Sequence, residues 1–262
     1  MLNFPLTDHL PGPPLLAAGG LVYSFFKSNI AGKVIVMVLL SISVFTWTLV
    51  LTRIRRLVTT QRQTRKFLRD YRADRTSLRQ YRLRREYQGG TLYAVYLAGC
   101  RELFYHLPEL MEDIEMLDPA YQPRRHLSGT QMRAVTSALE RSVGEHAVKL
   151  EDRMTLLASA VSGAPFLGLL GTVWGVMDTF SQVAIAGRPD FAAMAPGVAG
   201  ALLTTVVALL VAIPAMFGYN YLVGSIRALI VQMDNFAAEF AADLEHRFAA
   251  YPSRAPSERE ES

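Results

Sequence analysis

Three stretches of the chain are long runs of apolar residues, and most polar positions lie between them. The runs occupy residues 34–52, 154–186 and 191–223. A helix needs about 20 apolar residues to cross a hydrocarbon core of about 30 Å, so each run can span a bilayer. The second and third runs exceed that length, and their helices must tilt or protrude. The pattern predicts an all-α polytopic membrane protein with three transmembrane helices.

The segment between the first and second spans, residues 53–153, is polar with a helical period. Gly89 and Gly90 interrupt the first helical pattern, and two further patterns cover residues 91–117 and the stretch from Ser128 onward. The last pattern runs towards the second span without an evident break. Larger side chains recur at helical spacing in the first pattern: Leu57, Thr64, Leu68, Tyr71, Leu78 and Tyr81. We therefore expect a helical domain here.

The remaining segments are short. Residues 1–33 form the N-terminal part, in which the aromatic stretch 21–30 fits either an interfacial helix or a plain lead-in loop. Residues 187–190 are expected to form a tight turn, and residues 224–250 a helical extension of the third span. The polar tail 251–262 is expected to be disordered.

Charge gives the chain an expected orientation. Of its 262 residues 51% are apolar, and the net charge of +4 arises largely from arginines between Arg53 and Arg85. Such a cluster beside a span predicts a cytoplasmic location for that end. The helical domain and the C-terminus are then cytoplasmic, and the N-terminus and the turn 187–190 periplasmic. Tyrosines among the arginines also suggest nucleic-acid binding, but attraction to anionic lipid headgroups explains the cluster, so we expect no nucleic-acid partner.

The sequence does not predict an enzyme. One cysteine excludes an internal disulfide, and the five histidines have no ligand spacing, so we expect no metal and no cofactor. The glycines of the second span resemble a phosphate-binding loop, but no Gly-Lys-Ser/Thr follows them. Asp178 is the one acid within the apolar runs.

Small residues recur on one side of the second and third spans. In membranes such residues let helices approach closely. Gly168, Thr172, Gly175 and Thr179 share a helical face, with Gly171 beside them. The positions that we expect to pack helices together are Gly168, Gly171, Gly175, Pro196, Gly197 and Pro214.

The threonines of these spans have two interpretations. Thr172, Thr179, Thr204 and Thr205 can each bond to a carbonyl of their own helix, or they can line a narrow polar path, because a hydroxyl both donates and accepts. A hydroxyl cannot take up and release a proton near neutral pH, so a relay needs an ionisable group. Asp178 fits the mouth of a pore better than its centre. The decisive carboxylate is therefore expected on another chain.

Two long motifs are similar to those of a known family. GLLGTVWGVMDTF at 168–180 and APGVAGALLTTVVALLVAIPAMFGYNYL at 195–222 resemble the TolQ/ExbB branch of the MotA/TolQ/ExbB proton-channel family. FTWTLVLTRIRRL at 45–57 and DNFAAEF at 234–240 are also similar to it. The resemblance extends over residues 21–245 and includes the order of parts, with one span, a helical insertion and two further spans.

The resemblance implies a stator subunit of a proton-driven motor in the bacterial inner membrane. It implies a homopentamer around a TolR/ExbD-like single-span partner that carries the proton-binding aspartate, with work delivered to the outer membrane or envelope. A TolA/TonB-like protein can join the complex. By motif position Thr172 and Thr205 match the threonines lining the family's pore, whereas helical spacing alone leaves Thr204 and Thr205 open. Asp178, Thr179 and Thr204 are further pore-mouth or pore-facing candidates.

One position departs from the family pattern. The third span of the family commonly carries a glutamate within P-G-x-A-E-A-L, and this chain has Gly200 in its place, in the run PGVAGAL at 196–202. The departure leaves H⁺ and Na⁺ open as the transported ion. It also supports an alternative, an oligomeric membrane scaffold that organises envelope partners without conducting.

Overall fold

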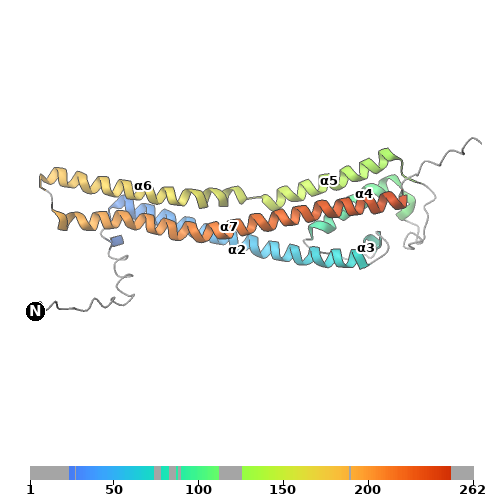
Figure 1. The fold of residues 1–262 in the computed structure, drawn as a ribbon, viewed down its shortest axis with the longest axis horizontal. Helices are drawn as coiled ribbons and strands as arrows, with labels where there is room; N and C mark the ends of the chain where they lie inside the picture. Colours follow the sequence, from blue (N-terminus) through green and yellow to red (C-terminus); the bar gives the residue numbers. More distant parts are fainter. Residues whose placement is uncertain are drawn as a thin grey trace, which may run out of the picture. The chain divides into compact units, whose positions relative to one another are not determined.

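The computed structural model describes residues 24–26, 28–73, 78–82, 87, 90–111, 126–188 and 190–248. Their regular structure is helical and contains no strand, which confirms the all-α prediction for this part of the chain (Figure 1). The elements are α2 (Ile30–Ala73), α3 (Arg79–Arg82), α4 (Thr91–His106), the 3₁₀ helix η1 (Pro108–Met111), α5 (Gly129–Glu151), α6 (Met154–Ala186) and α7 (Phe191–Phe248).

Three helical stretches are long and apolar enough to cross a membrane, and they include α2, α6 and α7. This agrees with the predicted membrane protein with three spans. Helix α6 covers the residues of the second predicted span, whereas α2 and α7 continue past the predicted ends of the first and third. The expected interfacial helix lies only partly within the described residues, and the tail 251–262 lies outside them. The sidedness of the helices and their limits in the bilayer stay predictions.

Two helix ends differ from the sequence-based expectation. The pattern from Ser128 predicted a helix running towards the second span without an evident break, and in the structure α5 ends at Glu151 and α6 begins at Met154. Between them Arg153 has a φ of 62°, in the left-handed region that a non-glycine residue seldom adopts. The first cytoplasmic pattern is also divided, since α2 ends at Ala73 and α3 is a separate short helix.

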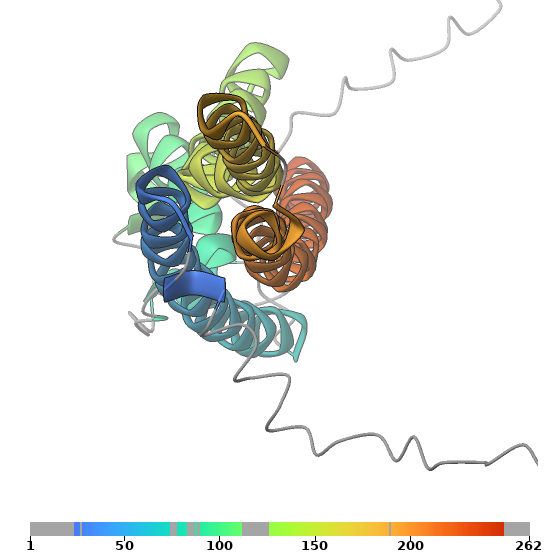
Figure 2. The ribbon, with the colours of Figure 1, turned by 90° about the vertical axis from the view of Figure 1, so that its left-hand side faces the viewer.

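The chain forms two compact units. Unit 1 comprises Met1–Leu51 and Met154–Asn220, and unit 2 comprises Thr52–Arg153 and Tyr221–Ser262. In unit 1, α6 and α7 run side by side from the turn that contains Gly187, and α2 lies next to them (Figure 1 and Figure 2). One buried cluster of this unit is aliphatic and consists of Leu39, Ala164, Ala208 and Ala212.

Unit 2 is built around aromatic side chains. Phe67 of α2 is completely buried, and five rings surround it at centroid distances of 5.2–6.0 Å: Tyr71, Tyr87, Tyr93, Tyr96 and Phe236. Helix α4 packs closely here, because a Cβ on Gly99 would lie 2.6 Å from Leu139 Cδ2 and 3.0 Å from Phe240 Cε1. Helix α5 begins with a capping box of Ser128 and Gln131.

Some polar bonds of unit 2 involve charged groups. The Tyr71 hydroxyl donates to Asp243 Oδ2 at 2.7 Å, and Arg72 donates to both carboxylate oxygens of Glu239 at 3.2 and 2.7 Å. Burial, followed by the bond to Asp243, raises the pKa of Tyr71 above its usual range. The bond to Glu239 raises the pKa of Arg72, so the guanidinium stays charged.

Candidate functional site

In unit 1, helix α6 presents a glycine-rich face to α7. A Cβ on Gly168 would lie 3.1 Å from the Thr205 Cα, and a Cβ on Gly175 would lie 3.1 Å from the Ala201 Cα. Gly171 faces the Thr204 side chain, with its ideal Cβ position 2.5 Å from Thr204 Oγ1. Since backbone atoms cannot move aside as a flexible side chain can, only glycine permits this approach.

Helix α7 contributes small residues to the same contact. Ala201, Thr204 and Ala208 are buried, and Gly197 faces Thr179, whose Oγ1 would lie 2.5 Å from an added Cβ. The four glycines expected to pack helices together therefore lie at the α6–α7 contact. The two expected prolines, Pro196 and Pro214, lie inside α7, which continues through both without interruption.

The hydroxyls of Thr172 and Thr205 meet across this contact and bond to each other. Thr172 Oγ1 also lies 3.1 Å from the Gly168 carbonyl oxygen and 3.4 Å from that of Ala201. Thr205 Oγ1 donates across the helices to the Gly168 carbonyl at 3.1 Å. Both side chains are half-buried. The Thr204 hydroxyl bonds to the same two carbonyls, so three hydroxyls and two carbonyls form one connected polar group within the apolar runs.

This group can be satisfied in two arrangements, because each hydroxyl donates one proton and accepts others. In one arrangement Thr172 donates to Thr205, and Thr205 donates to the Gly168 carbonyl. In the other Thr205 donates to Thr172, and Thr172 donates to the same carbonyl. The bond between the two hydroxyls can therefore reverse without leaving either one unpaired. Reversal of this kind is what a proton relay requires, although neither hydroxyl is ionisable near neutral pH.

Thr204 and Thr179 are buried and bond to backbone carbonyls. Thr204 Oγ1 lies 2.7 Å from the Ala201 oxygen and 3.0 Å from the Gly168 oxygen, and Thr179 donates to its own helix at Gly175 over 2.8 Å. Helical spacing left Thr204 and Thr205 open as the second pore-lining threonine, and that role stays a prediction. The Thr172 hydroxyl contacts that of Thr205, whereas Thr204 packs against Gly171.

Asp178 of α6 is held by two side-chain amides. Its Oδ2 accepts from Asn29 Nδ2 at 3.2 Å and from Gln182 Nε2 at 3.1 Å. Asn29 also accepts from the Gly32 N–H at 2.7 Å and so caps the start of α2. Sequence analysis missed Asn29, and its position just before the first apolar run was the signal available. In the part of the chain that the structure describes, no cluster of acidic, histidine and cysteine side chains could hold a metal.

The surroundings of Gly200 give a structural account of the departure from the family pattern. A Cβ at this position would lie 2.9 Å from the Ser28 Cα, 3.0 Å from the Ser28 Cβ and 3.2 Å from the Ser24 carbonyl oxygen. The space that a glutamate side chain would need at residue 200 is therefore filled by the segment that leads into α2.

Known proteins match the chain over this site. The model of the MotA/TolQ/ExbB proton channel family matches residues 111–235. The Tol-Pal system protein TolQ of Haemophilus influenzae is 30% identical over 225 residues, which cover 86% of this chain and 93% of that protein. TolQ of Pseudomonas aeruginosa is 39% identical over 116 residues, or 44% of this chain and 50% of the relative. The biopolymer transport protein ExbB of Xanthomonas campestris pv. campestris (strain B100) is 38% identical over 120 residues, or 46% of each chain.

These matches confirm the resemblance based on the two long motifs. The match to the Haemophilus protein extends over nearly all of that relative and is not confined to the glycine-rich spans. Together with the three long apolar helices, it shows that the chain belongs to the MotA/TolQ/ExbB proton channel family, as a TolQ/ExbB-like member.

Proposed function

We propose that this chain is the stator subunit of a proton-driven motor in the bacterial inner membrane. Membership of a proton channel family makes it an energy-coupling membrane subunit. The proposal of a proton-driven stator rests on the hydroxyl pair of Thr172 and Thr205. The hydrogen bond between these hydroxyls can reverse while both remain hydrogen-bonded. In the relay, one hydroxyl of the pair takes up a proton from the partner's acid, the other hydroxyl releases its own proton to water, and the bond between the two hydroxyls reverses.

The ionisable group of the relay belongs to a partner in this proposal. Asp178, the acid of the apolar runs, is tied to Asn29 and Gln182 rather than to the threonine pair. A TolR/ExbD-like single-span protein supplies the aspartate, and several copies of this chain, five by family resemblance, surround it. A charge crossing 100 mV releases about 2.3 kcal/mol, several times the thermal energy. That energy is delivered as work at the outer membrane or envelope, where a TolA/TonB-like protein can receive it.

The orientation in this proposal follows the arginines that begin at Arg53. They place unit 2 and the C-terminus in the cytoplasm and the N-terminus in the periplasm. The Thr172–Thr205 pair then lies within the bilayer, where water is scarce and a pair of hydroxyls can replace it as the connection for a proton.

A non-conducting scaffold is the second candidate, and one observation favours it. Gly200 replaces the family glutamate, and Ser24 and Ser28 fill the space beside it. A chain that only organises partners would need the packed α6–α7 contact but not the reversible hydroxyl pair.

Valine substitutions separate the two functions. Thr172→Val and Thr205→Val keep the shape of the side chain and remove the hydroxyl. We expect each to lower proton uptake by proteoliposomes containing the co-purified partner about 100-fold, as losses of proton-transfer groups do. The number of chains in the complex, counted by native mass spectrometry, should not change.

Thr48→Val is the matched control, because Thr48 is an exposed threonine of α2 whose hydroxyl bonds to the Val44 carbonyl at 2.8 Å. It should conduct like the unaltered chain. Normal proton uptake and normal outer-membrane integrity in both pore variants would instead support the scaffold.

A further inference from the structure

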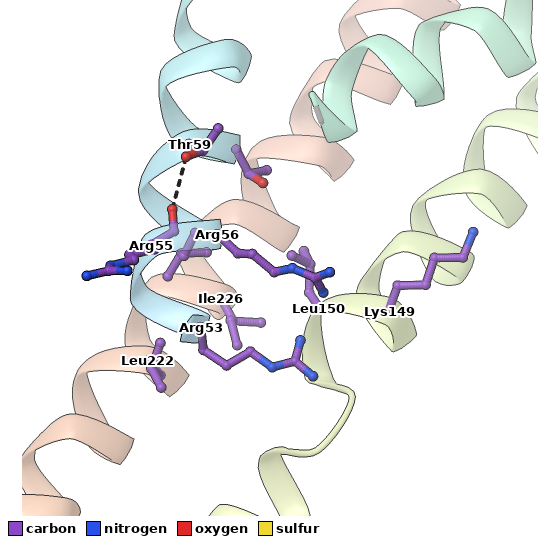
Figure 3. A pocket seen from close by; sticks show the side chains of 10 residues that line it. Arg53, Arg55, Arg56, Thr59, Lys149, Leu150, Leu222 and Ile226 are labelled. Carbon is purple, nitrogen blue, oxygen red and sulfur yellow. Dashed lines mark hydrogen bonds between the residues drawn. The ribbon is translucent and has the colours of Figure 1, made fainter. Parts of the chain in front are cut away.

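Unit 2 contains a basic cavity of about 480 Å³ lined by residues of α2, α5 and α7 (Figure 3). Its volume lies within the range of about 300–1,000 Å³ that is usual for small-molecule pockets. Arg53 and Arg56 enter it from α2, Lys149 lines it from α5, and Leu222 and Ile226 line it from α7. The cavity therefore combines cationic and aliphatic walls.

The cationic wall is only partly neutralised. Arg53 bonds to Asp152 Oδ2 at 2.9 Å, and the exposed fractions of these side chains are 14% and 61%. Among the residues that the structure describes, no acidic side chain pairs with Arg56 or Lys149. In Figure 3 the side chains of Arg53 and Arg56 extend from α2 towards α5, whereas that of Arg55 points the other way. Two guanidinium groups thus face the cavity, and one exposed carboxylate, that of Asp152, partly neutralises their charge.

The aliphatic wall suggests what kind of anion fits. Leu57, Leu222 and Ile226 line the cavity beside the arginines with side chains that are almost fully buried. Leu150 of α5 is half-buried and adds a partly accessible apolar side chain. Arg53 follows Leu51, near the end of the first apolar run, and Leu222 lies near the end of the third. A small free anion gains nothing from the apolar wall, whereas a lipid headgroup with its glycerol and first methylenes contacts both walls.

We propose that this cavity binds one anionic phospholipid of the adjacent leaflet through its phosphate group. Arg53 and Arg56 donate charge-assisted hydrogen bonds to the phosphate oxygens, for which the planar guanidinium is suited. Lys149 adds a third positive charge at the rim. Asp152 is exposed, so its ion pair is weak and Arg53 can turn from the carboxylate to the phosphate. The lipid would tie the interior of α2 and of α7 to the end of α5. This inference does not depend on proton conduction.

Lipid titration of the purified full chain tests the proposal. Detergent-solubilised protein is titrated with dioctanoyl phosphatidylglycerol and, separately, with dioctanoyl phosphatidylcholine, and native mass spectrometry counts the bound lipids. We expect one phosphatidylglycerol per chain, bound more tightly than the zwitterionic lipid. Arg53→Gln and Arg56→Gln should each weaken its binding about tenfold, the loss expected for one charge-assisted bond.

Two control variants make the result specific. Arg65→Gln removes the same charge from an exposed position of α2 outside the cavity and should bind the lipid as the unaltered chain does. Asp152→Asn breaks the ion pair but retains Arg53, so it should bind phosphatidylglycerol at least as tightly. Weaker binding by Asp152→Asn would show that loss of the ion pair alone explains the effect of Arg53→Gln.

Three results would overturn the proposal. The first is an equal loss of lipid by Arg65→Gln and the cavity variants, which would indicate diffuse attraction to the basic helix. The second is displacement of the lipid by millimolar inorganic phosphate, which would indicate a site for small anions. The third is equal affinity for the two lipids, which would show that the headgroup charge is not recognised.

Discussion

The helices of the two units pack through different kinds of residue, small ones in unit 1 and aromatic ones in unit 2. In unit 1, α6 and α7 meet through glycine, alanine and threonine, with Gly168 almost touching the backbone of Thr205. In unit 2, Phe67 lies inside a shell of five aromatic rings. Lipid tails are as apolar as leucine, so large side chains gain little by leaving them, and close backbone approach provides the attraction instead. Transfer of an aromatic ring from water into a protein core is favourable, and the core of unit 2 is built from such rings.

The polar groups at the α6–α7 contact and those beside the Phe67 shell follow the same division. The hydroxyls of Thr172, Thr204 and Thr205 bond to carbonyls and to each other without any formal charge. Unit 2 pairs Tyr71 with Asp243 and Arg72 with Glu239. Neutral bonds avoid the cost of a charge in hydrocarbon, whereas charged groups near water lose less solvation. The residues that pack each unit therefore suit its surroundings, hydrocarbon for the α6–α7 contact and water for the aromatic core of unit 2.

The largest effect should come from filling the glycine face. Gly168→Leu would force a side chain into the Thr205 backbone and Ala208, and we expect a cost of about 5 kcal/mol or more, among the most severe for one substitution. Gly163→Leu is the matched change on α6, because no atom lies within 4 Å of its added Cβ. Yield and thermal midpoint of the purified protein measure both. Equal tolerance of both changes would refute the close α6–α7 contact.

The next largest effect should come from the aromatic centre of unit 2. Phe67→Ala removes a fully buried ring and should cost about 3–5 kcal/mol of unfolding free energy. Tyr105→Ala removes a ring that is 78% exposed and should change the free energy by about 0.5 kcal/mol or less. Near-UV circular dichroism during thermal unfolding follows these rings. Similar losses for both variants would place Phe67 outside the core.

A smaller effect is expected where the segment before α2 meets α7. Gly200→Glu restores the residue type common in the family, but its side chain must displace Ser24 and Ser28. We expect a cost of about 1–3 kcal/mol, as for other overpacked sites, and faster proteolysis of the displaced segment. Gly200→Ala, which adds only the Cβ, should give a weaker form of both effects. An unchanged proteolysis rate for the glutamate variant would mean that this segment does not occupy the site.

Sequence reasoning succeeded where a periodic pattern decides the structure. The all-α class and the three apolar helices could be predicted because length and hydropathy determine them. The family could also be predicted, since its two long motifs lie in the second and third spans. In these segments length and hydropathy are enough to predict a long apolar helix.

The remaining features depend on contacts between distant residues. Asn29 and Asp178 are 149 positions apart, and no local pattern indicates that they meet. Phe67 was not distinguished from the other large residues of its helix, because only the tertiary structure shows which one the rings of α4 and α7 surround. The break between α5 and α6 at Arg153 contains no glycine or proline, the residues that usually signal a break. The left-handed backbone of Arg153 could therefore not be predicted from the sequence. Spacing alone also could not choose between Thr204 and Thr205.

Cys100, the only sulfhydryl of the chain, is completely buried within unit 2. Burial raises the pKa of its thiol above the usual range, and the deprotonated form is the nucleophile. The folded protein therefore offers electrophiles and oxidants no reactive thiol, and redox changes in its surroundings leave the subunit without a new cross-link through its own cysteine. An alkylating reagent can react with Cys100 only when the aromatic core opens transiently. The rate of alkylation therefore measures how often unit 2 unfolds locally.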